Sequence, residues 1–351
     1  MTSPLDLLRP PATDPTSIYR YRDGLYAADL LTAAISHLDF FTWLNEHPAD
    51  LHAICRALDL RERPTDVMLT LFTAMGLLRT DNGAFALTDL AREHLVKSSP
   101  WNIGPYFDSI KERPVCRDLV TVLRTGKPAN WASLKNEKEW SKAMETDAFA
   151  NQFTSAMDCR GVCLGPAMAA RLDCSNHRHL LDIAGGSGIY ACAIVARHPH
   201  LRATVLEKSP VDRIASRSIA ERGFGDRVGV HLGDMFVDPF PEGCDIHLFS
   251  NVLHDWDTDR VEELLRKSFA ALPPCGMVVV HDAHINAAKT GPLPVAAYSA
   301  LLMTITEGKC YSEVEMADYL ARAGFSGVTY FPTAADRSVI IAHKQPKTDA
   351  T

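Results

Sequence analysis

The chain has 351 residues, of which 46% are hydrophobic and 23% are charged, as expected for a globular protein of about two domains. Its net charge of −7 argues against nucleic acid or an anionic membrane as partner. The amino terminus has no signal-peptide pattern, and no apolar run approaches membrane-spanning length, so we expect a cytoplasmic protein. Nine cysteines without a CxxC pair indicate reduced thiols and predict no metal site.

The first part of the chain predicts a winged helix. Residues 17–48 have helical spacing, and the following stretch reads as helix, turn, helix and a hairpin that turns at Asp81-Asn82-Gly83. Winged helices often bind DNA, which requires a surplus of basic side chains. In residues 50–80 the charges cancel: the bases are Arg56, Arg61, Arg63 and Arg79, and the acids are Asp50, Asp59, Glu62 and Asp66. The sequence therefore disfavours DNA binding.

The second half of the chain alternates strands and helices. Residues 100–176 are mostly helical, with an amphipathic run over 139–157, and short apolar strands separated by helical patterns follow from residue 178. This alternation predicts an α/β fold with a doubly wound, mostly parallel sheet, and the last two strands predict an antiparallel edge. We expect three parts, residues 1–110, 111–176 and 177–346.

A glycine-rich turn follows the first of these strands, in the sequence LLDIAGGSGIYA. Gly185, Gly186 and Gly188 allow a ligand to approach the backbone, and the pattern fits a dinucleotide site as well as a methyl-donor site. The absence of a following Lys-Ser or Lys-Thr excludes a Walker loop. Asp182 would repel a pyrophosphate but would favour the cationic sulfonium of S-adenosylmethionine. A plain strand-to-helix turn is the structural alternative.

Two later strands end in groups that suit a nucleoside. Glu207 ends the next strand, where an acid suits the two ribose hydroxyls in either cofactor class. Asp234 and Met235 follow the third strand and can flank an adenine. All of these positions lie at carboxyl ends of predicted parallel strands, where such sheets bind ligands.

The stretch FSNVLHDWDTDRVEELL contains a candidate general base. His254 lies at the carboxyl end of the fourth strand, and a histidine suits proton removal near neutral pH. The alternative reading is a helix start in which Asp257 or Asp259 caps the helix and Glu262 completes a capping box. That alternative explains the acids but leaves the histidine unexplained.

The residues LDIAGGSG, VLE, GDMF and VLHDWDTDRVEELL, in this order, resemble the O-methyltransferases related to plant caffeate and acetylserotonin methyltransferases and their bacterial relatives. The resemblance implies a class I methyltransferase fold, S-adenosylmethionine as methyl donor and a small-molecule acceptor. It also implies a homodimer formed through the amino-terminal winged-helix domain. By position it assigns the donor to Asp182, Gly185, Gly186, Gly188, Glu207, Asp234, Met235 and Ser250, and the general base to His254.

The sequence departs from this family at two places. Ala184 stands where the first of three consecutive glycines is usual. Of two glutamates that orient the histidine in the plant enzymes, the first aligns with Asp282 and the second with Cys310, and Glu307 lies close by. The departure at Cys310 leaves the acceptor open.

We expect transfer of a methyl group to a hydroxyl oxygen, with His254 taking the proton. The first alternative is methylation at sulfur or carbon of a thioether acid or a 2-oxo acid. The second is a winged-helix regulator that binds the donor without catalysis. Besides Cys310, candidate walls of the acceptor pocket are Tyr106, Phe107, Phe153, Met157, Met303 and Tyr311.

Overall fold

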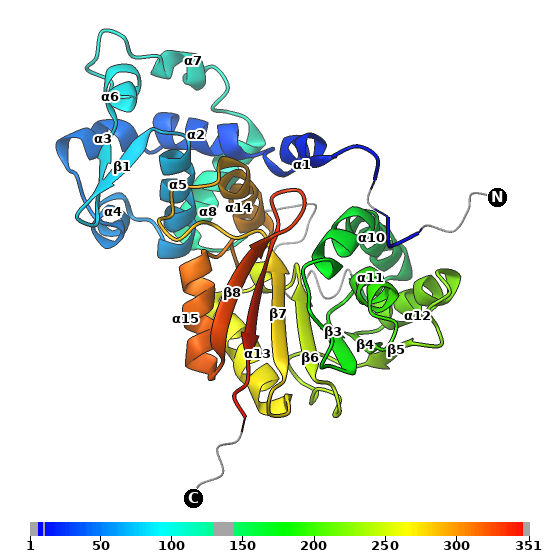
Figure 1. Ribbon diagram of the computed structural model, residues 1–351. Coiled ribbons are helices and arrows are strands. Elements are labelled where there is room, and N and C mark those ends of the chain that lie inside the picture. Colours follow the sequence, from blue (N-terminus) through cyan, green and yellow to red (C-terminus); the bar gives the residue numbers. More distant parts are fainter. Residues whose placement is uncertain (1–5, 10, 129–143, 347–351) are drawn as a thin grey trace, which may run out of the picture. The chain divides into compact units, whose positions relative to one another are not determined.

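A computed structural model of the protein describes residues 6–9, 11–128 and 144–346. The chain forms two compact units (Figure 1). The sheet unit comprises Met1–Ser17, Trp140–His284 and Glu313–Thr351, and the helical unit comprises Ile18–Glu139 and Ile285–Ser312. This division differs from the predicted boundaries at 110 and 176, because a helix at 147–169 belongs to the sheet unit and residues 285–312 belong to the helical unit.

The helical unit contains the predicted winged helix, with two helices followed by an antiparallel hairpin. Its elements are α1 (Thr16–Asp23), which begins in the sheet unit, α2 (Ala27–Ser36), α3 (Phe40–Glu46), α4 (Leu51–Leu58), α5 (Glu62–Ala74), β1 (Leu78–Asp81), β2 (Ala84–Leu87), α6 (Asp89–Leu95), α7 (Gly104–Asp108), α8 (Pro114–Thr125) and α14 (Leu293–Ile305). The stretch 17–48 is three helices, interrupted at Gly24 and at Asp39, whose φ of 52° is left-handed.

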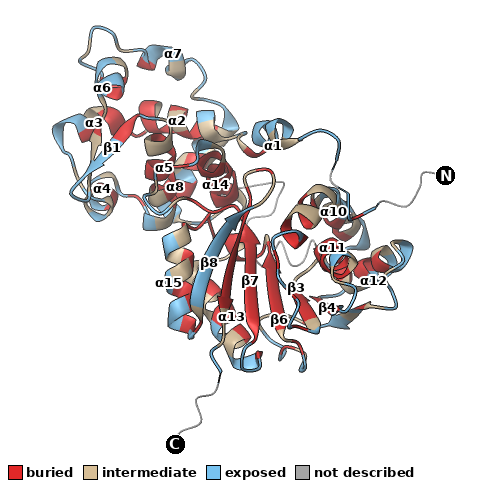
Figure 2. Ribbon diagram, in the orientation of Figure 1, coloured by how far each residue is buried: buried red, intermediate tan, exposed pale blue. Residues whose placement is uncertain are grey.

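The core of the helical unit lies between α5, α2, α8 and α14 (Figure 2). Phe72 of α5 packs against Phe40 and Phe41 with ring centroids 5.9 and 5.4 Å apart. Arg63, one of the bases considered for DNA, donates instead to the carbonyl oxygens of Gly308 at 2.6 Å and Gly126 at 2.9 Å. This arginine is therefore used to hold the unit together.

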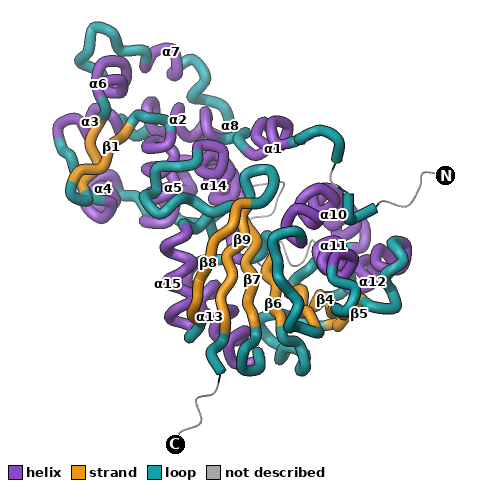
Figure 3. Tube along the Cα trace, viewed as in Figure 1, coloured by secondary structure: helices purple, strands orange, loops and turns teal. Residues whose placement is uncertain are grey.

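The sheet unit contains a seven-stranded sheet in the order β5-β4-β3-β6-β7-β9-β8 (Figure 3). Its elements are α10 (Asp147–Ala169), β3 (His179–Ile183), α11 (Ile189–Arg197), β4 (Arg202–Glu207), α12 (Val211–Glu221), β5 (Val228–Leu232), β6 (Ile246–Ser250), the 3-10 helix η1 (Leu253–Asp255), α13 (Thr258–Ala271), β7 (Met277–Asp282), α15 (Glu313–Ala323), β8 (Ser326–Pro332) and β9 (Ser338–His343). Of the predicted amphipathic run 139–157, residues 139–143 lie outside the described residues.

The topology confirms the predicted doubly wound sheet with an antiparallel edge. β3 to β7 pair in parallel, whereas β9 pairs antiparallel with β7 and β8. α11 and α12 pack against β3 to β5, and α15 packs against β8 and β9. The strand order reverses between β3 and β6, and ligands of such sheets bind beside this switch point at the carboxyl ends of the strands. Within the described ranges, no helix combines the length and apolar character needed to cross a bilayer.

Candidate active site

The loop between β3 and α11 turns sharply through three residues with left-handed backbones. β3 ends at Ile183 and α11 begins at Ile189, as predicted. Ala184, Gly186 and Gly188 have φ angles of 53°, 60° and 74°. Because a side chain disfavours this region, the two glycines match the backbone and Ala184 is the strained residue of the loop.

Asp182 lies beside this loop as a fully buried carboxylate. A Cβ on Gly185 would come within 2.5 Å of that carboxylate, so the position requires glycine. Among the described residues neither carboxylate oxygen has a hydrogen-bond partner. Burial raises the pKa of Asp182 to about 7, and Glu207 adds to this rise. A buried carboxylate in this state fits a cationic ligand, such as the sulfonium and amino groups of S-adenosylmethionine.

Glu207, at the end of the neighbouring strand β4, is held by two backbone amides. Its Oε1 accepts from the amide of Gly186 at 2.8 Å, and its Oε2 accepts from the amide of Lys208 at 3.0 Å. Burial raises the pKa of Glu207 to about 7 despite these amides. Each oxygen keeps a second lone pair, so the carboxylate can also accept hydrogen bonds from a pair of ribose hydroxyls.

The third predicted pair follows β5 at the same edge of the sheet. Asp234 accepts from the amide of Phe236 at 2.8 Å and pairs with Lys208 Nζ at 3.0 Å. Burial alone would raise the pKa of Asp234, but Phe236 and Lys208 outweigh it and lower the pKa. The carbonyl oxygen of Met235 accepts from Lys267 Nζ at 2.6 Å. The carboxylate of Asp234 and the backbone of Met235 are thus held by neighbouring groups.

His254 lies on η1, directly after β6, and forms a buried pair with Asp282 at the end of β7. The distance from His254 Nδ1 to Asp282 Oδ1 is 2.5 Å, and the other ring nitrogen, Nε2, lies 3.4 Å from Asp255 Oδ1. Burial would lower the pKa of His254, but Asp282 and Asp255 outweigh it and raise the pKa. For Asp282, His254 overcomes the effect of burial and lowers the pKa. The sequence did not point to Asp255, although this residue directly follows His254 in the stretch VLHDWDTDRVEELL.

Two further buried histidines flank this pair. His281 Nδ1 lies 2.8 Å from the hydroxyl of Ser250, and His284 Nδ1 lies 2.7 Å from that of Ser338. Burial lowers the pKa of His281 to about 3 and that of His284 to about 4, so both are neutral at physiological pH. The part of the chain that the structure describes brings no three metal-ligating side chains together. Ser250, predicted to contact the cofactor, is thus engaged with His281.

The predicted acceptor contacts are distributed over both units. Phe153 and Met157 are half-buried on α10 of the sheet unit, whereas Tyr106, Phe107, Met303, Cys310 and Tyr311 belong to the helical unit. Tyr106 is 80% exposed, and Met303, Cys310 and Tyr311 are buried. Glu307, also of the helical unit, pairs with Lys127 at 2.9 Å. Of the three predicted catalytic residues, the structure therefore brings together His254 and Asp282.

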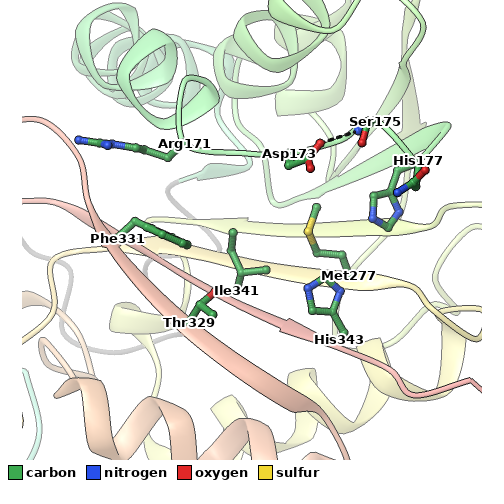
Figure 4. Close-up of a pocket in the computed structure, with 10 residues that line it drawn as sticks. Arg171, Asp173, Ser175, His177, Met277, Thr329, Phe331, Ile341 and His343 are labelled. Carbon is green, nitrogen blue, oxygen red and sulfur yellow. Dashed lines mark hydrogen bonds between the residues drawn. The ribbon is translucent and has the colours of Figure 1, made fainter.

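A cavity of about 310 Å³ lies at the opposite end of the sheet (Figure 4). Met277, Ile341 and Phe331 of neighbouring strands line it, together with the segment after α10 that includes Asp173. β7 begins at Met277, so this cavity lies at the amino ends of the parallel strands. It is separate from the glycine loop and His254, which lie at the carboxyl ends.

Comparison with known proteins agrees with this arrangement. Residues 117–326 match the family model described as an O-methyltransferase domain. The chain is 31% identical, over 91% of its length and 92% of the relative's, to 3-hydroxy-5-methyl-1-naphthoate 3-O-methyltransferase of Streptomyces sahachiroi. It is 29% identical to L-tyrosine C(3)-methyltransferase of Streptomyces lavendulae, over 92% of this chain and 90% of the relative.

A solved structure is similar over almost the whole chain. It is an O-methyltransferase family 2 protein from Planctomyces limnophilus in complex with apigenin, with 36% identity, a TM-score of 0.87 and coverage of 97% and 98% of the two chains. The fold and the site define a class I methyltransferase. The chain belongs to the O-methyltransferase family, as its motifs predict. It is an enzyme that uses S-adenosylmethionine to methylate a small molecule.

Proposed function

We propose that the enzyme methylates a hydroxyl oxygen on a small planar aromatic molecule, with His254 as the general base. The observation that carries this proposal is the buried His254–Asp282 pair at the carboxyl end of the sheet, beside the switch point. Methylation of a hydroxyl releases a proton, so a base positioned there has a defined task. The naphthoate named as the acceptor of one relative and the apigenin bound by the solved structure support an aromatic acceptor.

One set of residues binds the cofactor, and another set takes up the proton. The cofactor supplies an activated methyl group on a cationic sulfur. Asp182 complements the positive charge of the cofactor, and Glu207 holds its ribose through the hydroxyls. His254 accepts the acceptor's proton on Nε2, while Asp282 holds Nδ1–H and stabilises the positive charge that the ring gains. Asp255, 3.4 Å from Nε2, is a second carboxylate that favours this charge.

We also propose that the enzyme is a homodimer that associates through the helical unit. Tyr21 and Trp101 are 84% and 65% exposed, and Ile18, Leu25, Ile103 and Tyr106 are further exposed apolar side chains of this unit. Burying these side chains against a partner would remove their apolar area from water. A second copy of the chain is the partner that fits the family resemblance.

The test of the reaction follows label transfer from methyl-labelled S-adenosylmethionine to phenols, thioether acids and 2-oxo acids. We expect an O-methyl product from a phenol. His254→Ala should lower turnover by about 10² or more, with donor binding intact, whereas His231→Ala on the exposed part of β5 is the matched control. Transfer to carbon or sulfur at an undiminished rate in His254→Ala would overturn the proposal.

The pH profile of Asp282→Asn tests the role of the pair. His254 must be neutral to accept a proton, and Asp282 raises its pKa. Removing the carboxylate therefore lowers that pKa and moves the acid limb of kcat/KM to lower pH. The plateau should fall by about 10² because the ring loses its orientation. An acid limb that stays in place would show that another group titrates.

A further inference from the structure

Asp158, near the middle of α10, contacts the glycine loop. Its carboxylate accepts a hydrogen bond from the hydroxyl of Ser187, a buried residue of the loop that lies between Gly186 and Gly188. The same carboxylate accepts two hydrogen bonds from Nη2 of Arg222, at 2.7 and 2.6 Å, where α12 ends. Asp158 thus joins α10, the loop and α12 through one group.

The packing of α10 on α11 brings Asp158 to the loop. A Cβ on Gly161 would lie 2.3 Å from Ile189 Cγ2, and a Cβ on Gly165 would lie 3.1 Å from Ala193 Cβ. Two glycines one helical turn apart therefore let α10 approach α11 closely, along the first turns after the loop. Asp158 lies one turn before Gly161, level with the loop itself, and this spacing aligns its carboxylate with Ser187.

Polar contacts connect α10 with α12 and its carboxyl end, and they differ in burial. Asp147 pairs with Arg213 at 3.1 Å, and Asn151 accepts from Arg217 at 2.8 Å. The side chains of Asp147 and Arg213 are 75% and 62% exposed, whereas those of Asp158 and Arg222 are 22% and 19% exposed. Exposed ion pairs contribute little, so Asp147 offers a matched control on the same two helices.

From these contacts we infer that Asp158 is a positioning residue that holds the glycine loop in the shape that binds the cofactor. This inference rests on the proposed cofactor site at Asp182, Gly186 and Glu207. The loop contains three left-handed residues, one of them Ala184, so it needs outside contacts to keep this shape. A hydrogen bond to a charged acceptor is among the stronger ones a protein makes. Arg222 holds the Asp158 carboxylate in place through its two hydrogen bonds, so that the carboxylate faces Ser187.

The test measures cofactor affinity in Ser187→Ala, Asp158→Asn and the control Asp147→Asn. Calorimetry with S-adenosylmethionine and S-adenosylhomocysteine should show a dissociation constant raised about 10-fold in the first two variants. The KM for the donor should rise by the same factor, with kcat within about twofold of the unaltered enzyme. The double variant Asp158→Asn/Ser187→Ala should bind no more weakly than the worse single variant, because both remove one contact.

Two outcomes would overturn the inference. One is a folded Ser187→Ala protein that binds the donor normally. The other is an Asp158→Asn protein that binds normally although Ser187→Ala does not, since the serine would then act on the cofactor directly. Ser187→Ala retains the Asp158–Arg222 pair, so normal cofactor binding by this variant would overturn the inference even if Asp158→Asn fails to fold. Glu207→Ala in the same assay distinguishes failure of this inference from failure of the proposed cofactor site. Unchanged cofactor binding in Glu207→Ala would overturn the cofactor site itself.

Discussion

We expect Asp182 to determine how cofactor binding depends on pH. Its folded pKa of about 7 lies above the ordinary 3.8, so the carboxyl is partly protonated in the free protein near neutrality. A cationic ligand beside it favours the charged form, and binding therefore releases a proton. The same shift means that the free energy of unfolding of the ligand-free protein decreases as pH rises from about 4 to 7.

We therefore expect S-adenosylmethionine to bind more tightly as pH rises from about 6 to 8, with release of about half a proton from Asp182 at pH 7. Titration calorimetry in buffers of different ionisation enthalpy measures this release. Asp182→Asn should abolish the proton release that comes from Asp182. The release from Glu207, whose pKa is also raised to about 7, should remain. Proton uptake on binding, or an affinity independent of pH, would contradict the assignment of Asp182 to the cation.

At the level of single residues, the sequence identified side chains whose chemical role can be predicted from a short motif. His254 follows β6 and Asp182 lies near the end of β3, at positions where parallel sheets bind ligands, and Asp282 ends β7. Asp158 could not be found in this way, because its partner Ser187 is 29 residues away and only the fold brings them together. The left-handed backbone of Ala184 was likewise invisible, since alanine is not a residue that marks such a position.

Among the contacts between elements, the packing of α10 on α11 depends most on the absence of a side chain at one position, Gly161. Gly161→Ala would place a methyl group 2.3 Å from Ile189, a branched side chain that is 2% exposed and cannot move aside. We expect destabilisation by about 1–3 kcal/mol and weaker donor binding, because α11 carries the loop. Thermal unfolding with and without S-adenosylhomocysteine measures both effects. Gly229→Ala, where a Cβ meets nothing within 4 Å, is the control, and equal stability of the two variants would contradict this account.

The sequence was most informative where short apolar runs and helical patterns alternate along the chain. The strands β3 to β7 and the helices α11, α12 and α13 were all predicted from this alternation, although β6 and β7 are buried along their whole length. α14 was not predicted as a helix, since ten of its thirteen residues are buried and its apolar residues show no helical period. The breaks at Gly24 and Asp39 were missed because the apolar spacing continues across them.

For the whole chain, alternation of strands and helices predicted the class of fold, but it did not predict which unit each segment joins. Residues 285–312 follow β7 directly, yet they belong to the helical unit, where α14 packs against α5. By sequence order this segment would be assigned to the sheet unit. Its assignment to the helical unit follows only from the packing of α14 against residues that are distant in the sequence. The division of a chain into units is a property of such contacts rather than of local pattern.

The exposed apolar residues of the helical unit predict how the enzyme assembles. Ile18 and Tyr21 of α1 and the following Leu25 have helical spacing, and burying them against a second chain would remove apolar area from water. We expect the enzyme to sediment as a dimer, and Tyr21→Lys combined with Leu25→Lys to shift it toward a monomer. Tyr330→Lys, at a 40% exposed position on β8 of the sheet unit, should leave the dimer intact.

Sedimentation velocity over a range of protein concentrations separates the possible outcomes. An unaltered enzyme that sediments as one chain would show that the exposed side chains serve another purpose. A dimer that survives both lysines but dissociates in Tyr330→Lys would place the interface on the sheet unit. Because a solvent-exposed lysine costs the monomer little, a dissociated variant that keeps its circular dichroism spectrum and a cooperative thermal transition would owe its loss of dimer to the interface rather than to the fold.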